Sequence, residues 1–156
     1  MSEDGGQTPR SVWRMLQWLG PRVITRLHVS LYRLLGGRLV GGASTLLLTT
    51  VGRRSGQPRT VTVGYLRDGG DVIMMDTNFA KPAAPAWVLN LRAHPEAEVR
   101  LGRERYQAGA EFLEGEDRAG QWDRQVAAEP LVDQAQQLAG REIALIRLRR
   151  IKGSSE

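Results

Sequence analysis

Apolar and polar residues alternate over much of the chain after residue 43, which predicts a mainly β structure. Residues 45–51 form a short apolar, β-branched run, and residues 59–67 alternate between two faces. One face of this second segment carries Val61, Val63 and Tyr65. Asp68-Gly69-Gly70 has the residues of a tight hairpin turn, so residues 71–77 are expected to return as a third strand.

The second half of the chain predicts further strands and three helices. A hairpin is expected over 96–101 and 105–113 around Gly102, and a last strand over 141–151. Helical patterns cover 86–93, 114–128 and 131–138. The strands lack a repeated strand–helix–strand rhythm, which argues against a doubly wound nucleotide-binding fold. The pattern favours an α+β chain, in which about six antiparallel strands form a small barrel with helices outside it.

The first 42 residues differ from the rest of the chain. Residues 10–35 alternate arginines with an apolar stripe that Pro21 interrupts, and no acidic residue lies between Gly5 and Val51. We therefore divide the chain into a tail and basic amphipathic helix (1–42), a barrel domain (43–151) and a loose end (152–156). The helix is expected to pack on the barrel; the alternative is peripheral contact with an anionic membrane.

The amino-acid composition excludes several kinds of functional site. The chain of 156 residues suits one domain, and it has no cysteine and only two histidines. Disulfides, thiol nucleophiles and cysteine-ligated metals are therefore excluded, and no metal site is expected. The N-terminus lacks the pattern of a signal peptide, and no apolar run reaches membrane-spanning length, so a cytoplasmic protein is expected.

The net charge of +5 suits an anionic partner. Four Trp, three Tyr and two Phe are the only aromatic residues, and none is interleaved with the basic loop described next. Stacking recognition of nucleic acid needs such interleaving, so nucleic acid is not an expected partner.

Residues 52–59, Gly-Arg-Arg-Ser-Gly-Gln-Pro-Arg, are the most informative segment, and we name them the arginine loop. Glycines let backbone N–H groups approach a ligand, and arginine forks bind phosphate or carboxylate oxygens at two points. The glycine order is that of neither a P-loop nor a dinucleotide-binding loop. A solvated basic hairpin has the same composition, so the loop alone leaves both interpretations open.

Four segments together resemble the deazaflavin (F420)-dependent nitroreductase and quinone reductase family. They are residues 28–37, 49–59, 85–95 and 140–143, in that order and spacing. The resemblance implies a split β-barrel that binds F420, with FMN disfavoured. It also implies an enzyme in which reduced F420 passes a hydride to a small organic acceptor: a quinone, nitro compound, enone or biosynthetic intermediate. The alternative is a split barrel that binds a coenzyme or lipid without turnover.

The resemblance also implies which residues bind the coenzyme. The phosphate and glutamate tail would be held by Arg53, Arg54, Ser55 and Gly56. The second strand would lie beside the ligand through Arg59, Thr60, Val61, Thr62, Val63 and Gly64. The deazaflavin ring would contact Met75, Asp76, Thr77 and Asn78. The helix that follows would approach the coenzyme through Ala86, Trp87, Val88, Leu89 and Asn90.

This chain departs from the family at the expected substrate pocket. Many of these reductases have tyrosines there, whereas this chain has Val132 and Ala135, which predicts a more open pocket. No catalytic acid or base can be assigned. Trp87 is expected in the core, and Asn90 either at a helix cap or on the coenzyme. Asp76 is expected as an exposed strand-end carboxylate; the alternative is an acid–base residue.

Overall fold

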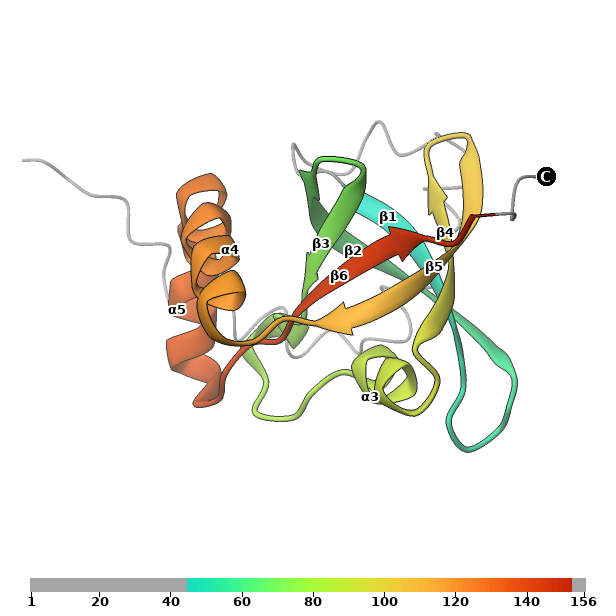
Figure 1. Cartoon of the computed structure of the whole chain (residues 1–156). Helices are drawn as coiled ribbons and strands as arrows, with labels where there is room; N and C mark the ends of the chain where they lie inside the picture. The colour runs from blue at the N-terminus through green and yellow to red at the C-terminus, as the bar shows by residue number, and fades with distance from the viewer. Residues whose placement is uncertain (1–44, 153–156) are drawn as a thin grey trace, which may run out of the picture.

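The computed structural model describes residues 45–152, and these form a closed antiparallel barrel of six strands. The strand order around the barrel is β1-β2-β3-β6-β5-β4 (Figure 1). The strands are β1 (Thr45–Val51), β2 (Pro58–Asp68), β3 (Asp71–Met75), β4 (Glu96–Leu101), β5 (Glu104–Phe112) and β6 (Leu145–Arg150). The predicted antiparallel barrel is confirmed. The predicted N-terminal helix and the boundary at residue 42 lie outside the described residues.

The two ends of the barrel are built differently. Because all neighbours are antiparallel, β1, β3 and β5 finish at the end where β2, β4 and β6 begin. This end, which we name the loop end, carries the arginine loop and the chain between β3 and β4. The opposite end carries two short hairpin turns; in one of them Asp68 pairs with Asp71 across Gly69-Gly70. Long connections, which can be shaped for a ligand, therefore gather at the loop end.

Helix α3 (Ala86–Ala93) lies at the loop end of the barrel (Figure 1). Its residues Trp87, Val88 and Leu91 join the main core. The alternating inward positions of the strands supply the rest of that core, including Leu46 and Leu48 from β1 and Ile146 and Leu148 from β6. The expectation that Trp87 packs in the core is confirmed by its 9% exposure.

Helices α4 (Gly115–Ala128) and α5 (Leu131–Ala139) lie at one side of the barrel (Figure 1). The outward residues Ile73 of β3 and Leu145 of β6 form a small cluster with Leu113, against which Trp122 of α4 packs. Strand β3 is therefore buried on both faces, which explains its nearly continuous apolar sequence from Val72 to Met75. Strand β6 is buried from Leu145 to Leu148, and Arg147 is the one charged residue of that stretch. Within residues 45–152, no helix is long and apolar enough to cross a membrane.

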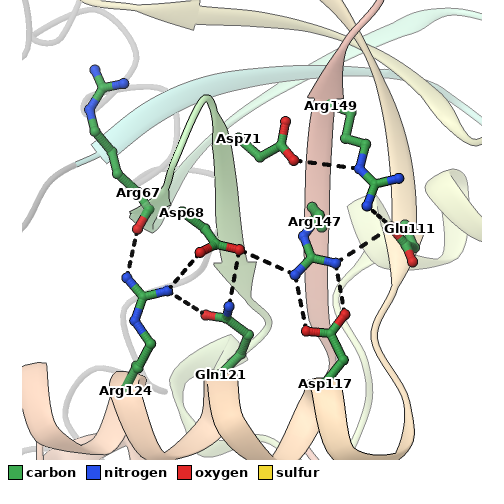
Figure 2. Close-up of polar contacts among 9 residues, drawn as sticks. All are labelled: Arg67, Asp68, Asp71, Glu111, Asp117, Gln121, Arg124, Arg147 and Arg149. Carbon is green, nitrogen blue, oxygen red and sulfur yellow. Dashed lines mark hydrogen bonds and ion pairs between the residues drawn. The ribbon is translucent and has the colours of Figure 1, made fainter.

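A network of charged residues joins α4 to the same side of the barrel (Figure 2). Arg147 of β6 is its centre and forms two hydrogen bonds with the Asp117 carboxylate, at 2.8 and 3.0 Å. It also donates to Asp68 Oδ2 at 3.2 Å, and Asp68 in turn accepts from Gln121 and Arg124 of α4. Nearby, Arg149 forms ion pairs with Asp71 and Glu111. We name these residues the Arg147 network.

Two predicted strands are shorter in the structure. The third strand ends at Met75 rather than residue 77, because a 3₁₀ turn, η1 (Asn78–Ala80), follows it. The last strand begins at Leu145 rather than residue 141, because Arg141 instead donates from its side chain to the chain after β3. The other predicted ends coincide with the observed ones or differ by one residue, which is within the usual variation of helix and strand limits.

Candidate functional site

The arginine loop is closed by its own backbone. The Gly52 N–H donates to the Gln57 carbonyl at 2.8 Å, and the Gly56 N–H donates to the Gly52 carbonyl at 2.8 Å. Gly56 has a φ of 67°, a left-handed value that glycine adopts easily. A Cβ at Gly52 would lie 2.6 Å from Ser55 Oγ and 3.1 Å from the Gln57 carbonyl oxygen, so a side chain here would displace the Ser55 hydroxyl and crowd the bond that closes the loop. Both glycines are therefore required by the tight shape of the loop.

Ser55 links the two halves of the arginine loop. Its Oγ accepts a hydrogen bond from the Gln57 N–H at 3.2 Å and lies 3.5 Å from Arg59 Nη2. Because the oxygen acts as the acceptor in both contacts, the hydroxyl proton can still be donated to a ligand. The loop is thus ordered mainly by backbone groups and the Ser55 oxygen, which leaves most guanidinium N–H groups of its arginines available to an anion.

The arginines of the loop have no carboxylate partners within residues 45–152. Arg53, Arg54 and Arg59 are exposed, and none of them takes part in an ion pair of the described structure. Three guanidinium groups on a short loop create a local positive potential, and without acidic neighbours this potential is not neutralised. Such a loop attracts an anion with several charges.

Asn90 attaches the arginine loop to α3. Its side chain is 3% exposed; Nδ2 donates to Thr50 Oγ1 at 3.0 Å. Its Oδ1 accepts from the Arg53 backbone N–H at 3.1 Å and from Arg53 Nη1 at 3.3 Å. The sequence left a helix cap or a coenzyme contact open for Asn90. The structure shows a buried amide that fixes the start of the loop, and a contact with the coenzyme stays a prediction. The other α3 residues that were predicted to approach the coenzyme differ in exposure: Ala86 is exposed, Leu89 is half-buried and Val88 is buried.

The predicted β2 residues fall on two faces of the strand. Val63 is buried in the core, and Val61 packs against it from a half-buried position. On the opposite face, Thr60 shares a hydrogen bond with Thr49, at 2.8 Å between the two hydroxyl oxygens. Thr62 Oγ1 is buried and has no hydrogen-bond partner within the described residues. Thr62 therefore carries a buried hydroxyl that no described residue uses, three positions after the end of the arginine loop.

The segment after β3 contains the predicted ring contacts. Met74 faces the core, whereas Met75 packs outward near Trp122. Asp76 is only 2% exposed, so the expectation of an exposed carboxylate is wrong. Arg141 Nη1 donates to Asp76 Oδ1 at 2.6 Å. Burial raises the pKa of Asp76, and the hydrogen bond and charge of Arg141 act in the opposite direction.

The two residues predicted to line the substrate pocket are buried in helix packing. Val132 is 3% exposed, and Ala135 is fully buried against Ala80 and Ile143. These contacts join α5 to the chain after β3. A role for either residue beside an acceptor stays a prediction.

The sequence interpretation did not assign Thr50 or Arg141 to the site. Both lie inside segments that carried the family resemblance, at residues 49–59 and 140–143. Their contacts join segments 40 to 65 positions apart, and no local pattern reveals such pairings. The only available signal was that each polar side chain stands next to an apolar strand.

Comparison with known proteins gives the same family over most of the chain. The model of the F420H(2)-dependent quinone reductase family matches residues 24–149. An F420H(2)-dependent quinone reductase of Mycobacterium tuberculosis is 33% identical over 108 residues, which cover 65% of this chain and 72% of that protein.

Solved structures agree with this relationship. The structure of an F420-H2 dependent reductase has a TM-score of 0.62 and 29% identity, and the match covers 68% of this chain and 94% of that one. A heme storage protein from Vibrio cholerae, at 17% identity and a TM-score of 0.51, shares the fold alone. The chain therefore belongs to the F420H(2)-dependent quinone reductase family, whose split-barrel enzymes are oxidoreductases that depend on reduced F420.

Proposed function

We propose that reduced F420 binds at the loop end of the barrel and that this chain directs its hydride to a small organic acceptor, with a quinone as the first candidate. The observation that carries the binding site is the arginine loop. Its three exposed arginines have no acidic partner within residues 45–152, yet the loop itself is closed by hydrogen bonds and fixed to α3. The loop is thus shaped for an anion before the anion arrives.

The residues present fit the coenzyme in its charges. F420 carries a phosphate and a glutamate tail, and the guanidinium groups of Arg53, Arg54 and Arg59 are the donors such groups prefer. The Ser55 hydroxyl is an additional donor within the arginine loop. Met75 and the following residues lie at the same end of the barrel and would contact the ring.

The chain's own task is to position the reactants and to exclude water. When bound, reduced F420 supplies the hydride, so the protein needs no nucleophile or metal for this step. Asp76 is held by Arg141 and faces away from solvent, which makes it an unsuitable proton donor to an acceptor. We therefore assign the residues of the loop end to binding and orientation, which account for most of the rate when two substrates must meet.

The names of the relatives support a quinone as acceptor, since the M. tuberculosis relative is an F420H(2)-dependent quinone reductase. Nitro compounds, enones and biosynthetic intermediates remain the other candidates to screen. A cytoplasmic location and membrane contact through residues 10–35 stay predictions, because that segment lies outside the described residues.

The binding test is a fluorescence titration of the protein with F420 and, separately, with FMN. Arg54→Ala should weaken F420 binding about 10- to 100-fold, as expected for a lost charge-assisted hydrogen bond. Arg103→Ala is the matched control: it removes one exposed arginine at the turn between β4 and β5, at the opposite end of the barrel. The control should bind F420 as the unmodified protein does.

Turnover is tested by following the oxidation of reduced F420 with and without a soluble quinone. Acceptor-dependent oxidation supports the reductase. F420 binding without oxidation by any acceptor class would instead identify a carrier of the coenzyme. Absence of F420 binding, or equal weakening by Arg54→Ala and Arg103→Ala, would refute the proposed site.

A further inference from the structure

Arg141 holds the chain that follows β3 at several points. Besides its bond to the Asp76 carboxylate, its Nη2 donates to the Asp76 carbonyl at 3.0 Å and its Nε donates to the Lys81 carbonyl at 3.2 Å. One guanidinium group thus binds both ends of residues 76–81, which we name the 76–81 loop. Arg141 belongs to the connection between α5 and β6, so it attaches this loop to a distant part of the chain.

The backbone of the 76–81 loop is strained. Asn78 has a φ of 41° and Ala80 a φ of 58°, and residues other than glycine rarely adopt such left-handed values. Asparagine tolerates this region better than alanine does, and the Asn78 side chain also donates to the Ala83 carbonyl at 2.6 Å. Strained backbone persists only where surrounding contacts fix it, and such strain is often found at binding sites.

The contacts around the loop account for this strain. Ala80 is 2% exposed and packs with Ala135 and Ile143, so one face of the loop rests on α5 and on the chain before β6. Arg141 supplies the polar half of the same attachment, since it binds the carbonyls that flank the two strained residues. The Asp76 carboxylate compensates the charge of this largely buried guanidinium group, whose side chain is 17% exposed.

We propose that Arg141, acting through Asp76 and the two flanking carbonyls, is a positioning residue that fixes the 76–81 loop in the shape that receives the deazaflavin ring. The inference rests on the proposed function, because it takes residues 75–78 as the ring contacts. The inference assigns two different roles at the loop end. The arginine loop binds the charged tail of the coenzyme. Arg141 does not contact the coenzyme but determines the shape of the surface on which the ring lies.

The experiment uses two ligands to distinguish binding of the deazaflavin ring from binding of the charged tail. One is F420, and the other is its deazaflavin chromophore with the ribityl chain but without phosphate and glutamates. Arg141→Lys keeps the charge, but a lysine cannot span two carbonyls and a carboxylate. We expect it to weaken both ligands by the same factor, about tenfold for the loss of such hydrogen bonds. Arg54→Ala should weaken F420 alone.

Arg118→Lys is the matched control for a general loss of stability. Arg118 lies in α4, donates to the Ile143 carbonyl at 2.8 Å and forms an ion pair with Glu142, but it does not contact the 76–81 loop. It should lower the unfolding temperature about as much as Arg141→Lys does and leave both affinities unchanged. The absorbance spectrum of the saturated chromophore gives a second measure, because at saturation it reports the surroundings of the ring rather than the affinity. Arg141→Lys should shift it, and Arg54→Ala should not.

The outcomes are distinct. If the unmodified protein binds neither ligand, the proposed function itself fails. If it binds both but Arg141→Lys leaves chromophore affinity and spectrum unchanged, the positioning role is refuted while the coenzyme site stands. Should Arg141→Lys not fold, Asp76→Asn keeps the accepting oxygen and removes the charge that compensates Arg141. A chromophore affinity and spectrum unchanged in this variant would equally refute the role.

Discussion

Arginines gather at two places on this barrel, and their surroundings are opposite. In the Arg147 network the central guanidinium is nearly buried and bound by Asp117 and Asp68, with Glu111 at 3.7 Å (Figure 2). In the arginine loop, Arg53, Arg54 and Arg59 are exposed and have no carboxylate partner among the described residues. The two clusters have similar residue types but differ in whether their charge is already neutralised.

This difference separates a structural role from a binding role. The carboxylates that pair with Arg147 belong to β2, β5 and α4, so its charge on β6 holds a helix and two strands together. The arginine loop makes its internal contacts through backbone groups, Ser55 and Asn90, which leaves its positive potential for an external anion. An arginine cluster therefore indicates a ligand only after its acidic neighbours have been examined.

The largest effect is expected from Arg147→Met, which removes the centre of the network. Methionine fills the space but leaves Asp117, Asp68 and Glu111 without their shared cation. Loss of one partner from a buried ion pair is strongly destabilising, and because these carboxylates are partly exposed we expect a loss of about 2–3 kcal/mol in the free energy of unfolding. Urea denaturation measures it, and F420 affinity of the folded protein should stay unchanged.

Arg149→Met is the control for this variant. Its side chain is 61% exposed and its ion pairs with Asp71 and Glu111 are at 3.4 and 3.3 Å, so we expect a loss of about 0.5 kcal/mol or less. Equal losses in the two variants would show that burial of Arg147 does not decide the strength of the network. Weakened F420 binding in Arg147→Met would contradict the separation of the two clusters.

Asn90→Ala tests how the arginine loop is held, and its effect should be the next largest. The change leaves the buried Thr50 hydroxyl and the Arg53 N–H without their partner, which we expect to lower stability by about 1–3 kcal/mol. F420 affinity should fall as well, because the loop is no longer fixed before binding.

Thr50→Val separates these two consequences. It removes the bond between α3 and β1 but keeps the contact of Asn90 with Arg53, so it should lower stability and leave F420 affinity nearly unchanged. Titration and thermal unfolding of both variants give the comparison. If Thr50→Val weakens F420 binding as much as Asn90→Ala does, the effect comes from the barrel end in general and not from the loop.

The fold was largely predictable because its strands follow simple local patterns. A short apolar, β-branched run gave β1 and alternation gave β2. Turn residues gave the two hairpins, Asp68-Gly69-Gly70 for β2 and β3 and Gly102 for β4 and β5. The errors lie where a side chain overrides the pattern. Arg141 takes the carbonyls of Asp76 and Lys81, so residues 76–77 and 141–144 leave the strands although their sequence alternates.

The candidate site was predictable only in part. The residue types of the arginine loop allowed either an anion site or a solvated basic hairpin, and the family resemblance favoured the anion site. The sequence could not reveal that Asp76 is buried or that Asn90 holds Arg53, since both facts depend on partners far away in the chain. Nor could the sequence distinguish Arg147 from Arg54, because the carboxylates that neutralise Arg147 come close to it only in the folded structure.

Ionic strength should affect the two regions differently. Exposed charges are screened within about 10 Å at 0.1 M salt, whereas contacts at hydrogen-bond distance in a nearly buried group are screened less. Raising the salt concentration should therefore weaken F420 binding several-fold while changing the free energy of unfolding little. Titrations and urea denaturation over the same salt series measure both. F420 affinity that does not depend on salt would contradict an electrostatic role for the arginine loop.

The smallest predicted effect is the response of the Arg147 network to acid. The hydrogen bond from Arg147 lowers the pKa of Asp117 below its ordinary value of 3.8. A carboxylate whose pKa is lower in the folded than in the unfolded state stabilises the fold above the unfolded pKa, and this contribution is lost as the pH falls through the folded pKa.

Asp117→Asn should therefore be less stable than the unmodified protein near neutral pH, and the difference should shrink below about pH 4. Asp123→Asn, at an exposed position of the same helix, changes the charge equally and should show no such convergence in urea denaturation measured between pH 3 and 7. Parallel behaviour of the two variants would mean that Asp117 acts through net charge alone and that its hydrogen bonds with Arg147 do not stabilise the fold.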